Sequence, residues 1–201
     1  MAEQVREPVQ ERSIKTKKKI IEGAYVLFSK VGYFNTNTAE IAKEAGVSTG
    51  IVYGYFKNKR DIMLDVLDVY MDKVYAPILA IFERLTPDKD DIGDMVEDIL
   101  ATALKIHEDN AAMHEALNSL SHSDQLVYDR FDQLEDDITK TFAGKFVANG
   151  YNNDDIYERV HVAMNIVHAY AQECVFDSHS YIDKVVMKNI VKEVVVGMFK
   201  K

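Results

Sequence analysis

Three observations on the 201-residue sequence predict an all-α protein of about nine helices. Apolar side chains repeat three or four positions apart in segment after segment, which is the spacing of one helix face. Candidate N-caps, each with an acidic residue three positions later, precede several of these segments. No segment has a visible partner strand. With 47% apolar and 28% charged residues, the chain has the composition of a soluble globular protein, and its length suffices for one domain or two small ones.

The N-terminal segment predicts a polar tail followed by a helix. Residues 1–13 are mostly polar and contain Pro8, so we expect a mobile tail there. The helix should run to about Val31, where Gly32 would end it. Its first turns carry a basic cluster, which is either a solvated helix end or an arm that contacts phosphate. The basic cluster consists of Lys15, Lys17, Lys18 and Lys19. The apolar face of the same helix consists of Ile20, Ala24, Leu27, Phe28 and Val31.

A capped short helix and a tight turn come next, in the run TNTAEIAKEAGVSTGIVYGYFKNKR (36–60). Asn37 can cap a helix that has Glu40 at its N3 position, which makes a capping box. Gly46 should end this helix, because a residue without Cβ adopts the left-handed conformation that a sharp reversal needs.

A second short helix follows the turn. Ser48 caps it, and Val52 and Phe56, four positions apart, give it one buried stripe. Asn58 and Asp61 repeat the capping-box pattern for a third helix. Two short helices joined by a glycine-containing turn form a helix-turn-helix, whose second helix enters the major groove of DNA. Corners of this kind also occur in plain helical bundles.

The side of the second helix that faces away from its apolar stripe favours the DNA-binding interpretation. Its residues are small, hydroxylated or aromatic, none is acidic, and three cations follow directly. Such a face suits a phosphate surface better than plain solvent. The face consists of Ser48, Thr49, Gly50, Tyr53 and Tyr55, and the cations are Lys57, Lys59 and Arg60.

The distribution of charge agrees with this interpretation, although the net charge of −9 alone argues against a nucleic-acid ligand. Residues 1–60 contain 11 Lys and Arg against 6 Asp and Glu, a balance of +5. The rest of the chain contains 13 against 27, a balance of −14. Because salt screens charges beyond about 8 Å, a basic head can bind DNA while the acidic body stays away from it.

The rest of the chain, from Asn58 onward, contains the other expected helices. A long helix opens at Asn58, and Pro77 should end or kink it near Val74, with a further helix over 77–85. The acidic run 88–94 would cap the next helix. The last helix is rich in β-branched residues, as strands are, but its length and a capping box formed by Ser180 and Asp183 favour a helix. This last helix is expected over about 181–199, and the helices before it over about 92–106, 110–120, 124–147 and 154–176.

The last two helices are apolar over more than one stripe, whereas a helix with one wet side needs only one. The excess predicts a second buried surface, most simply a two-fold dimer interface. A thick core within one subunit is the alternative. The residues small or flexible enough for close packing between subunits are Ala163, Val167, Ala171, Cys174, Val194, Gly197 and Met198.

A candidate ligand site lies in the same part of the chain. Four polar residues share one face of the helix over 154–176, and they would line a cavity, hydrogen-bond across the dimer or face water. Methionines elsewhere would suit an adaptable apolar pocket, although such residues more often belong to plain core. The polar residues are His161, Asn165, His168 and Gln172, and the methionines are Met95, Met113 and Met164.

Other classes of protein find little support. No run of 18 apolar residues and no signal pattern occurs, so we expect a cytoplasmic protein that does not bind membranes. The single cysteine, Cys174, is expected to be a buried structural thiol, with redox sensing as the alternative. His107, His114 and His122 fall near one helical face, but the helix breaks between them argue against a metal site. No HExxH, P-loop or GxSxG motif occurs, so we expect neither an enzyme nor a cofactor.

The run from Lys19 to Leu64 resembles the N-terminal domain of the TetR/AcrR family of transcriptional regulators. The resemblance covers about a quarter of the chain, and the rest shows no motif. It implies a helix-turn-helix domain over 14–60 and a ligand-binding and dimerisation domain over 61–201, with two subunits paired through their final two helices. The matching pieces are IIEGAYVLF (20–28), GY (32–33), Thr36, IAKEAGVS (41–48), Gly50, VYGYF (52–56) and Lys59.

The resemblance also implies roles for single residues. Many family members carry Lys or Arg where Thr49 stands, and a larger polar residue where Gly54 stands. This chain therefore lacks a bidentate guanine contact and keeps hydroxyl contacts and apolar contacts with thymine methyls, and Gly54 suggests a close approach of the backbone to DNA. Phosphates would be anchored by Thr36, Asn37, Tyr53, Tyr55 and Lys59, and bases approached by Ser48, Thr49 and Gly50.

The sequence thus predicts a homodimeric repressor that binds a palindromic operator in double-stranded DNA and is released by a small-molecule effector. The alternative is a helical carrier of small molecules, or a protein-interaction module, without sequence-specific DNA binding.

Overall fold

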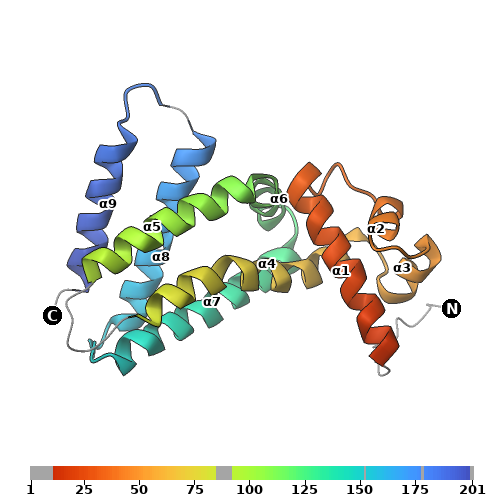
Figure 1. The fold of residues 1–201 in the computed structure, drawn as a ribbon, viewed down its shortest axis with the longest axis horizontal. Helices are drawn as coiled ribbons and strands as arrows, with labels where there is room; N and C mark the ends of the chain where they lie inside the picture. Colours follow the sequence, from red (N-terminus) through yellow and green to blue (C-terminus); the bar gives the residue numbers. More distant parts are fainter. Residues whose placement is uncertain (1–10, 85–91, 152, 178, 200–201) are drawn as a thin grey trace. The chain divides into compact units, whose positions relative to one another are not determined.

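A computed structural model of the chain describes residues 11–84, 92–151, 153–177 and 179–199. Helices make up the regular structure of these ranges (Figure 1), which confirms the all-α prediction. None of the helices in the described ranges combines the length and apolarity needed to cross a membrane. The helices are α1 (Glu11–Val31), α2 (Thr38–Glu44), α3 (Thr49–Tyr55), α4 (Lys59–Phe82), α5 (Ile92–Asp109), α6 (Ala111–Ser121), α7 (Gln125–Ala148), α8 (Ile156–Phe176) and α9 (Lys184–Met198).

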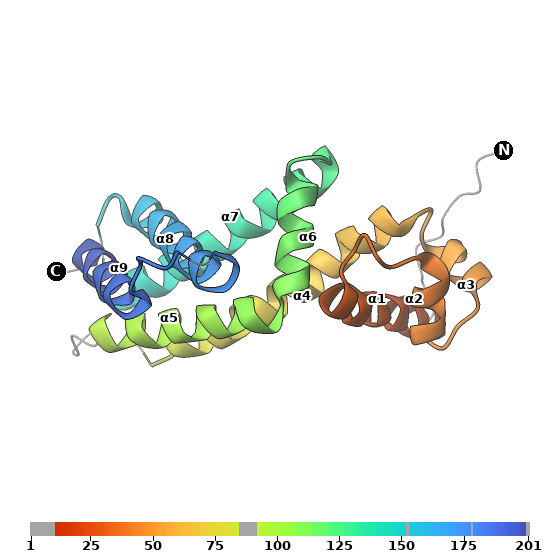
Figure 2. The ribbon, with the colours of Figure 1, turned by 90° about the horizontal axis from the view of Figure 1, so that it is seen from above.

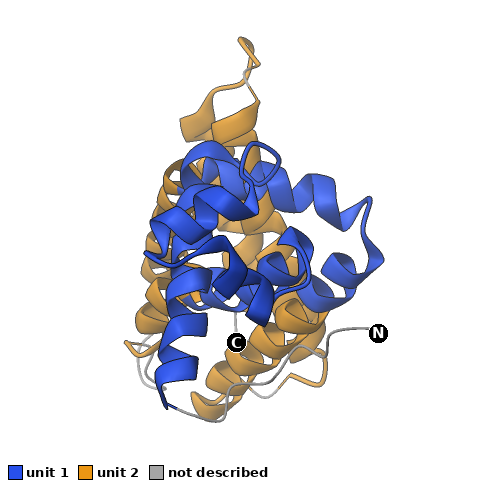
Figure 3. Ribbon diagram, turned by 90° about the vertical axis from the view of Figure 1, so that its right-hand side faces the viewer, with its two compact units in different colours: residues 1–72, 110–132 blue, residues 73–109, 133–201 orange. Residues whose placement is uncertain are grey.

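The chain divides into two compact units, which Figure 3 colours separately. The first comprises residues 1–72 and 110–132, and the second comprises residues 73–109 and 133–201. The long helices α4 and α7 therefore each contribute residues to both units. The sequence-based division placed the boundary between the DNA-binding and ligand-binding domains at residue 60. By packing, the first half of α4 and all of α6 belong to the same unit as the N-terminal helices.

Local signals place the short helices of the first unit as predicted. The Asn37 side chain accepts hydrogen bonds from the backbone N–H groups of Ala39 and Glu40, and the Glu40 carboxylate accepts one from the Asn37 N–H. This completes the capping box. Gly32 and Gly46 adopt φ values of 85° and 67°, where a side chain would be strained, and they end α1 and the α2 turn.

The core of the first unit forms around the apolar faces of these helices. Ile20 and Phe28 of α1 are fully buried, as are Ile41 of α2 and Val52 of α3. At the crossing of α1 and α2, a Cβ added to Gly23 would lie 3.1 Å from the backbone nitrogen of Ala45, so glycine permits the close approach. Burial of these stripes packs α2 against α1, and α3 against α2 (Figure 1).

The start of the first helix differs from the sequence-based expectation. Helix α1 begins at Glu11, so residues 11–13 are helical and not part of a mobile tail. The rest of the expected tail, residues 1–10, lies outside the described residues. Within the first described turn, the Lys15 side chain forms an ion pair with Glu11, four positions earlier.

Pro77 does not end its helix. Helix α4 continues through it to Phe82, so the prediction of a separate helix over 77–85 was wrong. Proline removes one backbone hydrogen bond and disfavours the helix interior. Ile78, Ile81 and Phe82, which follow it, are all buried in the core of the second unit, and this packing outweighs the local cost.

The core of the second unit lies where α5, α8 and α9 pack against one another, side by side in Figures 1 and 2. Its centre includes Leu100 of α5, Ala171 of α8 and Val195 of α9. Phe82 and Phe142 stack with ring centroids 4.7 Å apart, which adds a preferred aromatic geometry to the apolar packing.

The last helix is a helix and not a strand, as predicted, but it starts later than expected. Asp183, and not Ser180, is its N-cap, because the Asp183 carboxylate accepts hydrogen bonds from the N–H groups of Val185 and Val186. Lys188 and Lys192, one turn apart, both bind Glu97 of α5. The hydrogen bond from Lys188, and to a smaller extent the one from Lys192, lowers the pKa of the Glu97 carboxylate. One side of α9 is thereby turned toward α5.

Candidate DNA-binding site

Helix α3 has one buried and one exposed side. Val52 is fully buried and Phe56, its C-cap, is nearly so, as the stripe at i and i+4 predicts. On the other side, Gly50, Ile51 and Tyr53 are exposed, with 53% of Tyr53 accessible to solvent. The helix therefore presents a surface of small and aromatic groups without a negative charge.

The first turn of α3 carries the residues expected to approach bases. The Ser48 hydroxyl accepts a hydrogen bond from the Ile51 N–H at 3.4 Å and caps the helix, as predicted. Ser48 and Gly50 are exposed, and Thr49 is half-buried. A Cβ added at Gly50 or at Gly54 would meet no packed neighbour. Internal packing therefore does not require glycine at either position, and both leave the helix backbone bare on its outer side.

Two tyrosines of α3 make hydrogen bonds to other helices. The Tyr53 hydroxyl lies 2.9 Å from the Thr38 hydroxyl at the start of α2. The Tyr55 hydroxyl lies 2.9 Å from that of Ser13 on α1, and Tyr55 is half-buried. Thr38 was not among the residues singled out from the sequence, because its contact lies fifteen positions along the chain. These bonds fix the orientation of α3 against its neighbours.

Thr36 and Asn37 occupy different environments although they are adjacent. Thr36 is buried, and its hydroxyl donates to the Gly32 carbonyl at 2.9 Å. Asn37 is exposed, and its amide oxygen is used by the capping box, which leaves the Nδ2 group as its remaining donor. Of the two expected phosphate anchors, only Asn37 thus presents a side-chain donor at the surface.

Lys59, the last of the five expected phosphate contacts, is bound internally. Its Nζ donates to the carbonyl oxygens of Tyr33 and Thr36 at 2.7 Å each, and lies 4.1 Å from the centre of the Tyr33 ring. Desolvation of the ammonium lowers the pKa of Lys59, and burial raises the pKa of the Tyr33 phenol.

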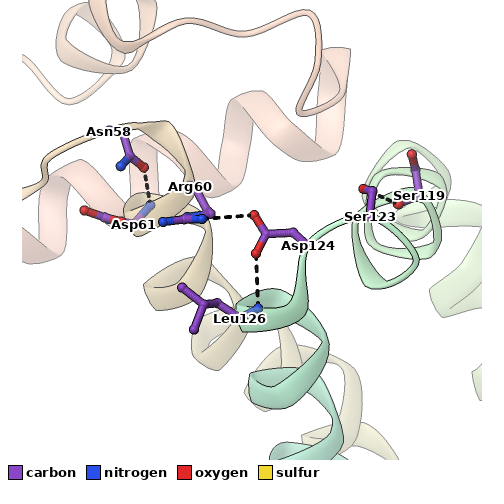
Figure 4. Close-up of polar contacts among 7 residues, drawn as sticks. All are labelled: Asn58, Arg60, Asp61, Ser119, Ser123, Asp124 and Leu126. Atoms are coloured by element: carbon purple, nitrogen blue, oxygen red, sulfur yellow. Dashed lines mark hydrogen bonds and ion pairs between the residues drawn. The ribbon is translucent and has the colours of Figure 1, made fainter.

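The residues around Lys59 order the start of α4 (Figure 4). Asn58 accepts a hydrogen bond from the Asp61 N–H, while the Asp61 carboxylate bonds to the Lys57 N–H rather than closing the predicted box on Asn58. Arg60 reaches Asp124 at 3.4 Å. The other oxygen of Asp124 accepts from the Leu126 N–H at the start of α7, so one carboxylate serves both elements. Sequence reasoning missed Asp124 because it lies 64 positions from Arg60.

The basic cluster at the start of α1 is partly neutralised within the chain. Lys15 and Lys18 form ion pairs with acidic residues of α1 itself, and Lys17 pairs with Asp65 of α4 at 2.6 Å. Lys17 also lies over the Phe56 ring. These ion pairs are what a solvated helix end would form. A contact between this basic cluster and DNA phosphate stays a prediction.

The expected ligand residues do not form one cluster. Met113 is buried in the first unit, whereas Met95 and Met164 belong to the core of the second. His161 and Asn165 are exposed on α8, and the Asn165 amide donates to the His161 carbonyl of its own helix. Gln172 is half-buried on the same face.

His168, the remaining ligand candidate, contacts a residue that sequence reasoning assigned to another group. Its Nδ1 lies 3.2 Å from Nε2 of the buried His107, whose Nδ1 lies 2.8 Å from the Ala103 carbonyl. If His107 Nδ1 carries the proton, its Nε2 accepts from His168 Nδ1. Burial lowers the pKa of His107 to about 4 and also lowers that of His168. His107 is therefore neutral at pH 7.

No group of three metal-ligating side chains occurs among the described residues. Of the three histidines considered for a metal site, His107 pairs with His168, His114 bonds to the Tyr70 hydroxyl at 2.8 Å, and His122 lies against the Asn118 carbonyl. They serve three different contacts. Cys174 is half-buried.

The outer side of α8 and α9 differs from the expected dimer face. Ala163, Val167 and Ala171 point into the core of their own unit, so the expectation that they pack between subunits was wrong. Both sides of these helices are apolar enough to be buried, and local pattern does not tell which one α5 covers. The exposed apolar side chains of α8 and α9 are Tyr157, Val162, Phe176, Val185, Val186, Ile190 and Val194.

Comparisons with known proteins agree with this geometry. Residues 20–66 match the family described as bacterial regulatory proteins, tetR family. The chain is 45% identical over 64 residues to the uncharacterized HTH-type transcriptional regulator YuxN of Bacillus subtilis (strain 168), a match that covers 32% of this chain and 22% of that protein. The chain thus spans about a quarter of the length of the curated relatives it matches first.

Two solved structures share the fold of nearly the whole chain. A protein from Mesorhizobium loti MAFF303099, described as a TetR-family transcriptional regulator, superposes with a TM-score of 0.75 at 17% identity, covering 94% of this chain and 97% of its own. A regulator from Saccharomonospora viridis in complex with choline gives 0.68 at 17% identity, with coverage of 90% and 96%. The segment over residues 20–66, with its capped helix-turn-helix, therefore matches the tetR family of bacterial regulatory proteins, and the chain as a whole has the all-helical fold of the solved TetR-family structure.

Proposed function

We propose that the protein is a ligand-responsive transcriptional regulator that binds a palindromic operator as a homodimer. The observation that carries this proposal is the two-sidedness of α3. Val52 is buried, while the opposite side offers hydroxyl, glycine and tyrosine surface with no acidic group. In a helix-turn-helix, such a side lies in the major groove.

Specific contacts would come from the first turn of α3, and positioning contacts from around it. Ser48, Thr49 and Gly50 would face base edges, with hydroxyls and a bare backbone in place of a long cation. Asn37 and Tyr53 would contact phosphates, which fixes register without reading sequence. Two copies of α3 related by a two-fold axis would enter successive major grooves about 34–36 Å apart.

The outer sides of α8 and α9 support the dimer. In a single chain, Ile190 is 56% exposed and lies in a run of exposed β-branched residues on α9. A soluble protein rarely leaves such a patch uncovered, and a two-fold contact between identical patches covers both copies. The exposed polar residues of α8, His161 and Asn165, would then lie at or beside this interface, where they need partners.

An effector would act through the second unit. The structural relative from Saccharomonospora viridis contains choline, which supports a small-molecule site in this fold. A ligand shifts the balance between DNA-bound and free states only by its difference in affinity for the two. We propose that the effector favours the free state, which makes the protein a repressor.

Selection of bound duplexes from a random pool, followed by affinity measurements across a salt series, tests the proposal. We expect an enriched palindrome and a steep fall of affinity with salt. Gly54→Glu places a negative charge on the exposed side of α3, where a side chain meets no neighbour, and should abolish binding.

Gly144→Glu is the matched control, because Gly144 is also a helical glycine with open space, but it lies in α7. It should leave binding unchanged. If the folded chain enriches no sequence, or if its affinity is flat across the salt series, the proposal fails and a carrier or interaction module becomes the better assignment.

A further inference from the structure

Lys59 stands at the start of α4, but its side chain serves the loop between α1 and α2. Its Nζ donates to two carbonyl oxygens of that loop, those of Tyr33 and Thr36, at 2.7 Å each. The face of the Tyr33 ring lies 4.1 Å from the same atom. An ammonium has three N–H donors, so two carbonyls and an aromatic face satisfy most of its bonding capacity within the chain.

The two carbonyls lie next to the N-cap of α2. Thr36 directly precedes Asn37, and the Thr36 N–H donates to Tyr33 while its hydroxyl donates to Gly32. Those bonds close the loop from the α1 side, and Lys59 closes it from the α4 side. The position of Asn37, whose side chain holds the N–H groups of Ala39 and Glu40, therefore depends on Lys59.

The surroundings of Lys59 support a structural role. Tyr33 is buried and packs edge-on against Phe28 of the first unit's core, with ring centroids 5.2 Å apart. The lysine is thus held over a ring that cannot move freely. Burial lowers the pKa of its ammonium, as expected for a group that has exchanged water for protein contacts.

We propose that Lys59 is a positioning residue for DNA binding, which holds the loop over residues 33–36 so that Asn37 and the start of α2 meet the phosphates, and that it does not bind phosphate itself. This inference rests on the proposed DNA-binding function.

Charge-removing and charge-keeping variants separate the two roles. Lys59→Met keeps the length of the stem without the ammonium, and Lys59→Arg keeps the charge but offers a planar, wider donor group. Lys57→Met is the matched control, since Lys57 is exposed two positions earlier. Affinity for a selected duplex is measured over a salt series, and amide hydrogen exchange of Thr36, Ala39 and Glu40 is measured without DNA.

We expect Lys59→Met to weaken binding about tenfold at every salt concentration and to leave the slope of log affinity against log salt unchanged. Exchange of the three amides should become about tenfold faster, because their hydrogen bonds open with the loop. Lys59→Arg should weaken binding as well, although it retains the charge. Lys57→Met should leave exchange unchanged.

A salt slope reduced by about one in Lys59→Met would overturn the inference, because that is the loss expected for one phosphate contact. Full binding by Lys59→Arg, or unchanged exchange in Lys59→Met, would overturn it too. Should Lys59→Met not fold, Tyr33→Leu removes the ring beneath the ammonium and should speed the same exchange. If the unmodified protein binds no duplex, the proposed function fails, and the exchange measurement still reports whether Lys59 holds the loop.

Discussion

The hydroxyl groups of Tyr53 and Thr38 lie 2.9 Å apart, which ties the exposed side of α3 to the first residue of α2. Tyr53 is an expected phosphate contact, and Thr38 stands one position after Asn37. A phosphate bound between α2 and α3 would therefore meet groups whose mutual position is already set.

Removal of either hydroxyl tests this pairing. We expect Tyr53→Phe and Thr38→Val each to weaken binding to all duplexes alike, by about 1 kcal/mol, because phosphate contacts carry no sequence information. The double variant should be little weaker than either single one if the two hydroxyls act as a pair. Affinities for several selected duplexes check this, and an effect confined to one base position would contradict it.

Two glycines of the first unit should respond in opposite ways to alanine. Gly23→Ala pushes a Cβ to 3.1 Å from the Ala45 backbone, and we expect the free energy of unfolding to fall by about 1–3 kcal/mol. Gly54→Ala meets open space and should raise stability by up to about 1 kcal/mol through helix propensity, while it weakens DNA binding. Chemical denaturation and affinity measurements check the pair. Weakened stability in Gly54→Ala would show a packing role that the structure does not contain.

The buried His107 should make stability depend on pH. Its pKa is about 4 in the fold and about 6.5 when unfolded, so the unfolded chain binds more protons between these values. Stability should therefore be retained above pH 6.5 and fall as the pH drops toward 4.

The denaturation midpoint of His107→Gln, followed from pH 7 to pH 4, should fall less than that of the unmodified protein. His122→Gln removes an exposed imidazole and serves as the control. Parallel pH curves for the unmodified protein and His107→Gln would count against the assignment.

The proposed interface on α9 makes a prediction about assembly. Ile190→Glu places a charge in an exposed apolar run and should shift the protein from dimer to monomer while its helix content stays unchanged. Val147→Glu is matched to it, since Val147 is an exposed apolar residue of α7. Sedimentation velocity and circular dichroism check both, and a dimer that survives Ile190→Glu would place the interface elsewhere.

Local features of the sequence were sufficient for the short helices. The caps at Asn37 and Ser48, the left-handed glycine at Gly46 and the buried stripe of Val52 all depend on residues within one or two turns, and all were predicted correctly. Pro77 was misjudged because packing in the second unit opposes its local preference.

Contacts between distant residues could not be predicted in the same way. Lys59 was expected at a phosphate from the family resemblance and its position, yet its partners lie 26 and 23 positions earlier in the chain. The inward side of α8 was not evident because both of its sides carry apolar residues. The polar face with His161 and Asn165 was identified from helical spacing, but only packing shows that it points outward.

The outward run of β-branched side chains on α9 has a practical consequence for anyone who purifies this protein. A monomeric chain exposes an apolar strip on α9, which promotes adsorption to plastic and slow precipitation. The strip consists of Val185, Val186, Ile190 and Val194. Dilute samples and short truncations around α9 are therefore the preparations in which losses should be watched first.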